Sequence, residues 1–84
     1  MTSDDVLGVV RDAVVTVMEV EPGTVTRDSR LVEDLRCDSL ALVEIVEIVE
    51  ERLARAHAGF RIDDADLDDI ATVGQAVDYA VARL

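Results

Sequence analysis

Ser39 is the side chain of this sequence best placed for covalent chemistry. It lies in the tripeptide Asp38-Ser39-Leu40, where a helical pattern of apolar residues begins. Either Asp38 or Ser39 is expected to be the N-cap, whose side chain accepts hydrogen bonds from the free N–H groups of the first turn. If Asp38 is the cap, the Ser39 hydroxyl faces solvent. A phosphate attached there would meet the positive end of the helix dipole.

Catalysis by a nucleophilic serine needs a base and an orienting carboxylate beside the hydroxyl. The only histidine is His57, most of a helix length away, and we expect it to be exposed near the helix end. The sequence therefore predicts no catalytic triad. Ser39 is interpreted either as a helix cap or as a modification site.

The segment after Ser39 is predicted to be an amphipathic helix over about residues 39–53, because its apolar residues recur at spacings of three and four. The outer face is acidic and has no basic residue before Arg52. Each like-charged pair costs about 0.2–0.5 kcal/mol on a helix, so this face serves either solubility or a basic partner. The apolar stripe comprises Leu42, Ile45, Val46, Val49 and Leu53, and the acidic face Glu44, Glu47, Glu50 and Glu51.

Three other helices are predicted to position this one. The first runs from about residue 3 to 18, with Ser3 as a plausible cap, and the sequence Pro22-Gly23 prevents its continuation. A short helix or turn is expected at about 64–69, and a last helix at 73–83. Thr72 and Gln75 form a capping-box signature for that last helix. The expected inward residues are Leu7, Val10, Val14 and Val17 in the first helix, and Ala76, Val77, Ala80 and Val81 in the last.

The predicted fold class is all-α: a small four-helix bundle with three main helices, one short helix and a long loop between the first two. Leu31, Val32 and Leu35 are expected to pack this loop onto the bundle. The only aromatic residues are Phe60 and Tyr79, whose hydroxyl is expected near the surface, so the core consists mainly of small aliphatic side chains. We expect that the core opens to admit an aliphatic chain; the alternative is a closed, well-packed bundle. The expected site lies near Val46, Val49, Ile62, Ile70 and Val77.

Length and charge limit the possible partners. The 84 residues are expected to form one domain, 1–84, and their net charge of −11 argues against nucleic acid and favours partners with basic patches. No basic leader or apolar run of membrane-spanning length is present, so a cytoplasmic monomer without membrane insertion is expected.

Metal and disulfide chemistry are not predicted. The single cysteine, Cys37, is interpreted as a small apolar loop residue whose thiol could give adventitious dimers. The acidic run 63–69 resembles the start of an EF-hand loop. It has Asp69 where the turn needs Gly, and Gln75 at the position of the bidentate Glu. One Cys and one His are too few for a zinc site.

The run Val32-Glu33-Asp34-Leu35, followed after two residues by Asp38-Ser39-Leu40 and the acidic helix, resembles the acyl carrier proteins of fatty acid and type II polyketide synthesis. The segment from Thr72 to Tyr79 is similar to the start of that family's last helix. The resemblance implies that Ser39 carries a 4′-phosphopantetheine arm, transferred from coenzyme A by a phosphopantetheinyl transferase. The terminal thiol of that arm would hold acyl groups as thioesters, and the protein would be a carrier rather than an enzyme.

The resemblance also implies a docking surface for partner enzymes, namely ketosynthases, acyltransferases, reductases and thioesterases. Four features depart from the family pattern: Arg36 where Gly is frequent, Ala41, a long segment 54–61, and Asp63 where many members have Pro. These departures affect which partner enzymes the protein binds, and none of them involves Ser39. The alternatives are a peptidyl or aminoacyl carrier, or an unmodified acidic helical adaptor. The implied docking residues are Asp38, Leu40, Val43, Glu44, Glu47, Glu50 and Glu51.

Overall fold

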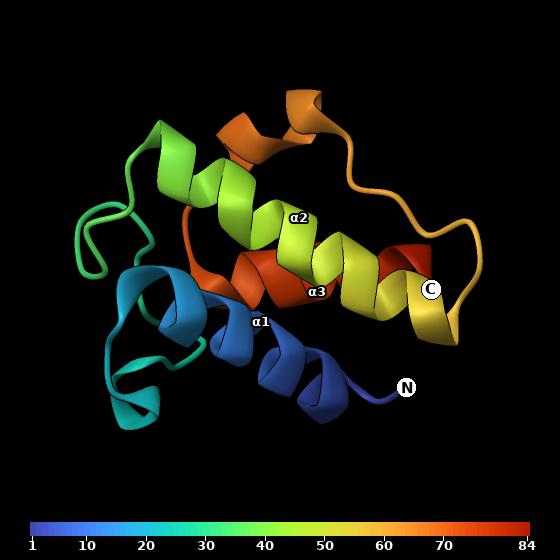
Figure 1. Cartoon of the computed structure of the whole chain (residues 1–84), viewed down its shortest axis with the longest axis horizontal. Coiled ribbons are helices and arrows are strands. Elements are labelled where there is room, and N and C mark those ends of the chain that lie inside the picture. The colour runs from blue at the N-terminus through green and yellow to red at the C-terminus, as the bar shows by residue number, and fades with distance from the viewer.

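Three helices surround one apolar core in the computed structural model, which describes residues 1–84. They are α1 (Ser3–Met18), α2 (Ser39–Ala56) and α3 (Val73–Arg83), and α1 packs against both of the others (Figure 1). Two 3₁₀ helices lie in the connections: η1 (Pro22–Thr24) and η2 (Asp64–Asp69). The predicted all-α fold, with three main helices, one short helix and a long first loop, is confirmed. The single turn of η1 is an addition to it.

The start of α1 is capped by Thr2, so the prediction of Ser3 as the cap is wrong. Thr2 Oγ1 accepts a hydrogen bond from the Asp5 N–H at 3.1 Å, and the Asp5 carboxylate accepts one from the Thr2 N–H at 3.0 Å. This reciprocal capping box satisfies two backbone donors, whereas Ser3 already lies inside the helix.

The buried face of α1 is wider than predicted and lies about one residue to the side. Leu7 and Val17, predicted to point inward, are only half-buried at its edges. The reason is that α1 contacts two helices rather than one, so its inward face must fill the space between α2 and α3. The buried residues of α1 are Val6, Val9, Val10, Ala13 and Val14.

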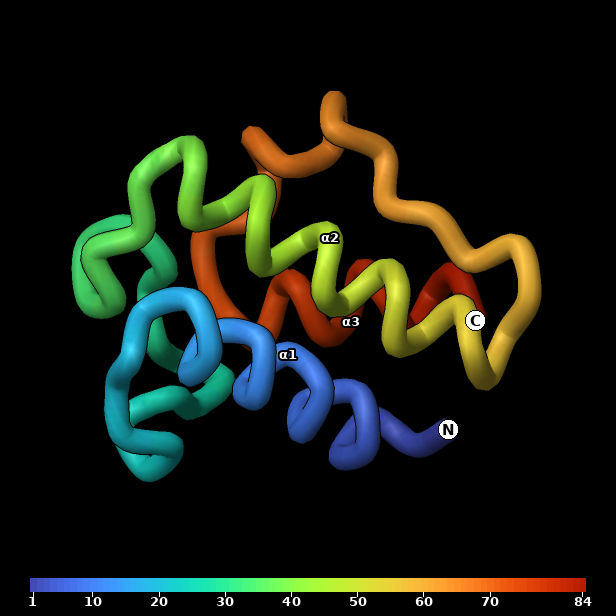
Figure 2. Tube along the Cα trace, viewed as in Figure 1, coloured from blue at the N-terminus to red at the C-terminus, as the bar shows by residue number.

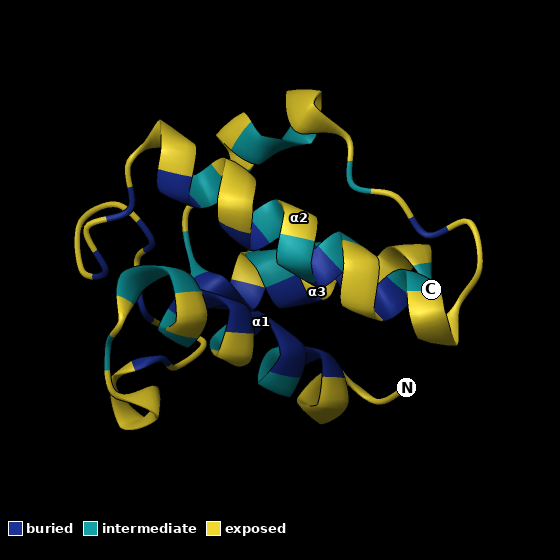
Figure 3. Cartoon of the chain, in the orientation of Figure 1, coloured by how far each residue is buried: buried dark blue, intermediate teal, exposed yellow.

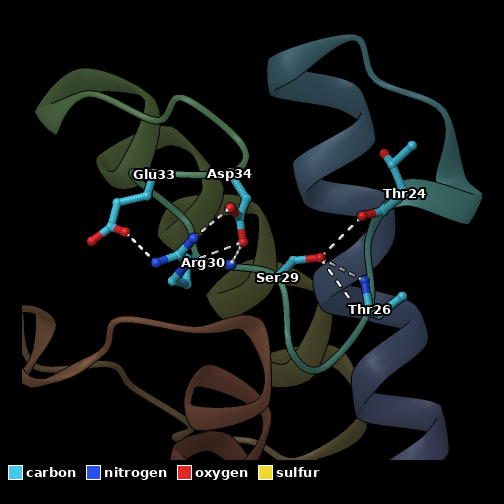
Figure 4. A network of polar contacts seen from close by, with 6 residues as sticks. All are labelled: Thr24, Thr26, Ser29, Arg30, Glu33 and Asp34. Atoms are coloured by element: carbon cyan, nitrogen blue, oxygen red, sulfur yellow. Dashed lines mark hydrogen bonds and ion pairs between the residues drawn. The ribbon is translucent and has the colours of Figure 1, made fainter.

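The long connection between α1 and α2 is held by backbone and hydroxyl hydrogen bonds. The buried Ser29 hydroxyl donates to the Thr24 carbonyl at 3.0 Å and accepts from the Thr26 N–H at 3.0 Å (Figure 4). The carbonyls of Ser29 and Arg27 accept hydrogen bonds from the N–H groups of Val73 and Gly74 at the start of α3. The connection therefore completes the first turn of α3.

Leu31 and Leu35 are buried, as predicted, but Val32 is 58% exposed, and its predicted packing onto the bundle is wrong. Residues 31–35 form a tight turn in which Leu31 and Leu35 share the inward side. The residue next to Leu31 therefore points outward.

α1 contacts both α2 and α3, and the buried side chains of the three helices, mostly small and aliphatic, form one core (Figure 3). Ile45, Val49 and Leu53 of α2 are buried, while Leu42 and Val46 are half-buried at the border with η2. The predicted Thr72–Gln75 capping box is present at the start of α3. In the last turn of α3, however, Val81 is 38% exposed, so the prediction that it points inward is wrong. The reason is that α3 ends at the surface there.

Both chain termini lie beside the C-terminal end of α2 (Figure 2). Met1 and Leu84 line a shallow pocket there together with Ala56 and His57. His57 is the exposed C-cap residue of α2, as predicted. None of the helices has the length and apolar composition that crossing a membrane requires.

Candidate functional site

Asp38, and not Ser39, caps α2. The Asp38 backbone is extended, and its Oδ1 accepts a hydrogen bond from the Ala41 N–H at 2.8 Å. Ser39 is the first residue of the 18-residue helix and is exposed. Its hydroxyl makes no hydrogen bond to the rest of the chain, so it is available to a modifying group. The sequence left open which of the two residues is the cap, and the structure settles it.

The turn before Asp38 ends in an αL motif, one of the hydrogen-bond patterns that close helices. The Arg36 N–H donates to the Val32 carbonyl at 3.1 Å and the Cys37 N–H to the Leu31 carbonyl at 3.0 Å. Arg36 has a φ of 62°, the left-handed conformation that this motif requires. Leu31 and Cys37 are both buried, which gives the motif its usual apolar contact and fixes where α2 begins.

Cys37 occupies the apolar loop position expected for it and is 2% exposed. Burial, and secondarily the negative charge of Asp38, raises the pKa of its thiol. The thiolate is the reactive form of cysteine, so the adventitious dimers expected from the sequence are disfavoured.

The acidic face of α2 divides into free and engaged carboxylates. Glu44 and Glu47 are exposed and form no ion pair or hydrogen bond with the rest of the chain. Glu50 is half-buried and accepts a hydrogen bond from the Ile62 N–H at 2.9 Å, and Glu51 pairs with Arg55 at 3.0 Å. Only Glu44 and Glu47 of the four are therefore unengaged.

Two apolar side chains are exposed beside Ser39 on the same helix. Leu40 is 67% exposed and Val43 is 44% exposed. Leu40, Val43, Glu44 and Glu47 recur at spacings of three and four, so they lie along one side of α2. The structure thus brings together an apolar centre and two free carboxylates next to the exposed hydroxyl, whereas Asp38 is engaged in capping.

A cavity of about 50 Å³ lies beneath α2, between that helix, η2 and α3. Four of the five residues expected to admit an aliphatic chain line it, namely Val46, Val49, Ile62 and Ile70. Val77, the fifth, is fully buried and does not line it. The remaining lining residues are Val10, Leu31, Leu42, Ile45, Leu67, Ala76 and Tyr79.

The acidic segment 63–69 forms structural contacts. The Tyr79 hydroxyl, half-buried near the surface as expected, accepts a hydrogen bond from the Asp63 N–H at 3.1 Å. Asp66 accepts hydrogen bonds from Tyr79 and from Arg83. The structure contains no group of three or more His, Cys, Asp or Glu side chains arranged to hold a metal ion.

Residues 8–80 match the family model described as the phosphopantetheine attachment site. The chain belongs to the acyl carrier protein family. It is 33% identical to the acyl carrier protein of Thermotoga maritima over 81 residues, which are 96% of this chain and 94% of that one. It is 36% identical to the acyl carrier protein of Chloroherpeton thalassium over 83 residues, 99% of this chain and 98% of that one.

The structure of the acyl carrier protein from Enterococcus faecalis superposes over 100% of both chains, with a TM-score of 0.76 and 33% identity. The meromycolate extension acyl carrier protein of Mycobacterium leprae is 32% identical over 94% of this chain and 64% of its own length. These comparisons support the acyl carrier role over the alternatives of a peptidyl carrier or an unmodified adaptor. Acyl carrier proteins are carriers rather than catalysts.

The prosthetic group of the family is 4′-phosphopantetheine. The site fits such a group, because an exposed serine with an uncommitted hydroxyl stands at the start of a long helix. The sequence did not indicate the αL motif at Arg36 or the hydrogen bonds of Ser29. Nothing in the local pattern indicated either of them.

Proposed function

We propose that Ser39 carries the 4′-phosphopantetheine arm and that the chain, a single domain over residues 1–84, carries acyl groups for fatty acid or polyketide synthesis. The observation that carries the proposal is the division of roles between two neighbours: Asp38 caps α2, and the Ser39 hydroxyl stays exposed and unbonded. When bound, the arm supplies a thiol that holds an acyl group as a thioester.

The chain's own residues would hold the phosphate of that arm and present it. Asp38 engages the Ala41 N–H, and the first turn of α2 has further backbone N–H groups without partners in the helix. These groups and the helix dipole favour an anion at this end of α2. The only histidine, His57, caps the far end of the helix. We therefore assign catalysis to the partner enzymes and none to this chain.

The proposed docking surface consists of Leu40 and Val43 at its centre, with Glu44 and Glu47 beside them. Exposed apolar side chains supply contact energy, and free carboxylates steer partners that carry basic patches. Glu50 and Glu51 have partners within the chain, so their contribution would be to the field of the surface rather than to direct contacts. The proposed partners are a phosphopantetheinyl transferase, ketosynthases, acyltransferases, reductases and thioesterases, met in the cytoplasm by a monomeric carrier.

We further propose that the cavity beneath α2 receives the first part of an aliphatic acyl chain. The cavity is small, with a volume of about 50 Å³. A longer chain therefore requires η2 to move away from α2. Amide chemical shifts of the loaded protein with and without an octanoyl group test this. Shifts at Val46, Ile62 and Ile70 are expected, and unchanged core signals would contradict it.

Intact mass after incubation with coenzyme A and a broad-specificity phosphopantetheinyl transferase tests the attachment. The wild-type protein should gain the mass of one arm, and Ser39→Ala should gain none. Ser3 provides a matched control, because it is also an exposed serine at the first position of a helix, behind a capping residue. Ser3→Ala should be loaded like wild type. No gain in wild type, or a gain that survives Ser39→Ala, would defeat the proposal.

A further inference from the structure

We propose that Arg36 contacts the phosphate group of the arm carried by Ser39. The inference rests on the proposed attachment to Ser39 and adds a residue that holds the phosphate in place. It arises from a departure of this chain from its family, since glycine is frequent where Arg36 stands.

Arg36 is a cation without a partner in a strongly acidic protein. Of the eight arginines, five form ion pairs with carboxylates, and Arg11 donates to the Val25 carbonyl at 3.2 Å. Arg36 and Arg61 are the two whose side chains make no hydrogen bond or ion pair. The five paired arginines are Arg27, Arg30, Arg52, Arg55 and Arg83.

The carboxylates nearest to Arg36 in the chain are already engaged. Glu33 and Asp34 both pair with Arg30, whose N–H and guanidinium also hold the pKa of Asp34 below its usual value (Figure 4). Asp38 caps α2. The charge of Arg36 is therefore free for an anion that arrives from outside the chain.

Arg36 is exposed and lies close to the attachment site along the chain. Cys37, the next residue, is buried, while Arg36, Asp38 and Ser39 are exposed. Only Cys37 and Asp38 separate Arg36 from Ser39, so the two Cα atoms are at most about 11 Å apart. Because both side chains are exposed at this separation, a phosphate on the Ser39 oxygen can come within reach of the long arginine side chain.

The backbone of Arg36 has a left-handed conformation. Its φ of 62° is a conformation that glycine adopts freely and that is unfavourable for a residue with a Cβ atom. Arginine at such a place needs a contribution that glycine cannot make. The guanidinium is suited to that role, because its fork of N–H donors matches the oxygens of a phosphate.

The experiment compares apo and loaded forms of wild type, Arg36→Gln, Arg36→Lys and Arg36→Gly. Arg36→Gln keeps the Cβ atom and the strained backbone and removes only the charge. Arg61→Gln is the matched control, because Arg61 is the other arginine without a partner. The mass gain on loading is recorded first and tests the attachment itself, so that failure of the attachment is distinguished from failure of the contact.

Two readouts then test the contact: the ³¹P chemical shift of the loaded protein, and the change in urea midpoint between its apo and loaded forms. We expect loading to raise the midpoint of wild type and Arg61→Gln, and this rise to be lost in Arg36→Gln and Arg36→Gly and partly kept in Arg36→Lys. The ³¹P signal should move in Arg36→Gln and not in Arg61→Gln. Apo Arg36→Gly should be more stable than apo wild type, because glycine relieves the backbone.

An Arg36→Gln protein with the same ³¹P shift and the same rise on loading as wild type would overturn the proposal. The absence of any rise in wild type would overturn it as well. If Arg36→Gln changed only the KM for coenzyme A in the loading reaction, the phosphates contacted would be those of free coenzyme A, and the contact within the loaded protein would be refuted.

Discussion

The Tyr79 hydroxyl donates a hydrogen bond to the Asp66 carboxylate at 2.6 Å, and this contact joins η2 to α3. Arg83 strengthens the junction, because its guanidinium lies 3.7 Å from the centre of the Tyr79 ring and also pairs with Asp66. Leu67 and Ile70, which line the cavity beneath α2, belong to or directly follow η2. The Tyr79–Asp66 contact therefore holds in place the segment that closes the cavity.

Replacing Tyr79 with Phe removes this contact and keeps the ring. The change also removes the acceptor of the Asp63 N–H, so we expect Tyr79→Phe to lower the free energy of unfolding by about 0.5–1.5 kcal/mol for each of the two hydrogen bonds. Amide hydrogen exchange should become faster in residues 63–70 and stay unchanged in α1. Equal exchange rates in both proteins would show that Tyr79 does not hold η2.

The same hydroxyl predicts a loss of stability in alkali. Burial, and then the hydrogen bond to Asp66, raises the pKa of Tyr79. The folded state thus favours the neutral phenol. The contribution of the Tyr79 hydroxyl to the free energy of unfolding is therefore complete below the unfolded pKa of about 10, and it is lost as the pH rises through the folded pKa. Wild type should lose stability more steeply than Tyr79→Phe above about pH 10, as measured by urea unfolding at a series of pH values.

Asp38 is expected to matter for both stability and loading. Asp38→Ala removes the cap and should cost about 0.5–2 kcal/mol of stability. The Ser39 hydroxyl is then the nearest replacement cap, so loading by the transferase should slow as well. Asp38→Asn is the control, because asparagine caps as well as aspartate, and it should retain most of the stability. Equal loading rates in wild type and Asp38→Ala would contradict the link between capping and the availability of the hydroxyl.

Gly74 marks the close contact between the long connection and α3. A Cβ atom at this position would lie 3.0 Å from the Arg27 carbonyl oxygen, which also accepts the Gly74 N–H. Gly74→Ala should therefore destabilise the protein by about 1–3 kcal/mol, the typical cost of overpacking. Gly8→Ala is the opposite case: Gly8 lies inside α1 with open space around it, and alanine there should add about 0.5–1 kcal/mol. Urea denaturation of the two variants gives the comparison.

The unengaged pair Glu44 and Glu47 should govern association with basic partners. Glu44→Lys combined with Glu47→Lys is expected to slow acyl transfer from a ketosynthase or acyltransferase at low salt, with a smaller effect at high salt because of screening. Far-ultraviolet circular dichroism should be unchanged. A variant with Glu21→Lys and Asp28→Lys carries the same change of charge on the long connection, and it should transfer at nearly the wild-type rate. If both variants slowed transfer equally, net charge rather than this surface would be responsible.

Local patterns predicted most of the helices because each helix carries its own signals. The spacing of apolar residues placed α2, and Thr72 with Gln75 marked the start of α3. The start of α1 was misplaced by one residue because Thr2 and Ser3 are both good caps and only Thr2 has an acid three positions later. The displaced buried face of α1 and the exposed Val32 depend on which segments lie opposite, and this is decided by tertiary packing.

The residues of the candidate site could be predicted from the sequence. Which of their side chains are occupied by hydrogen bonds or ion pairs within the chain was harder to predict. Asp38 and Ser39 were equal candidates for the cap, because the choice depends on where the helix backbone begins. The hydrogen bond from Ile62 to Glu50 spans 12 residues and removes Glu50 from the free carboxylates, and no local spacing indicates such a contact. The sequence alone marks Arg36 only as a departure from the pattern that the family resemblance implies. Its left-handed backbone and lack of a partner emerged from the folded chain.

Met1 and Leu84 both line the pocket at the C-terminal end of α2, and Ser39 stands at the other end of that helix. At 1.5 Å per residue, the 18 residues of α2 separate the two ends by about 27 Å. An affinity tag, a fluorescent label or a surface linker joined to either terminus would thus leave the modification face clear. The protein can be immobilised through its ends and still be assayed for loading.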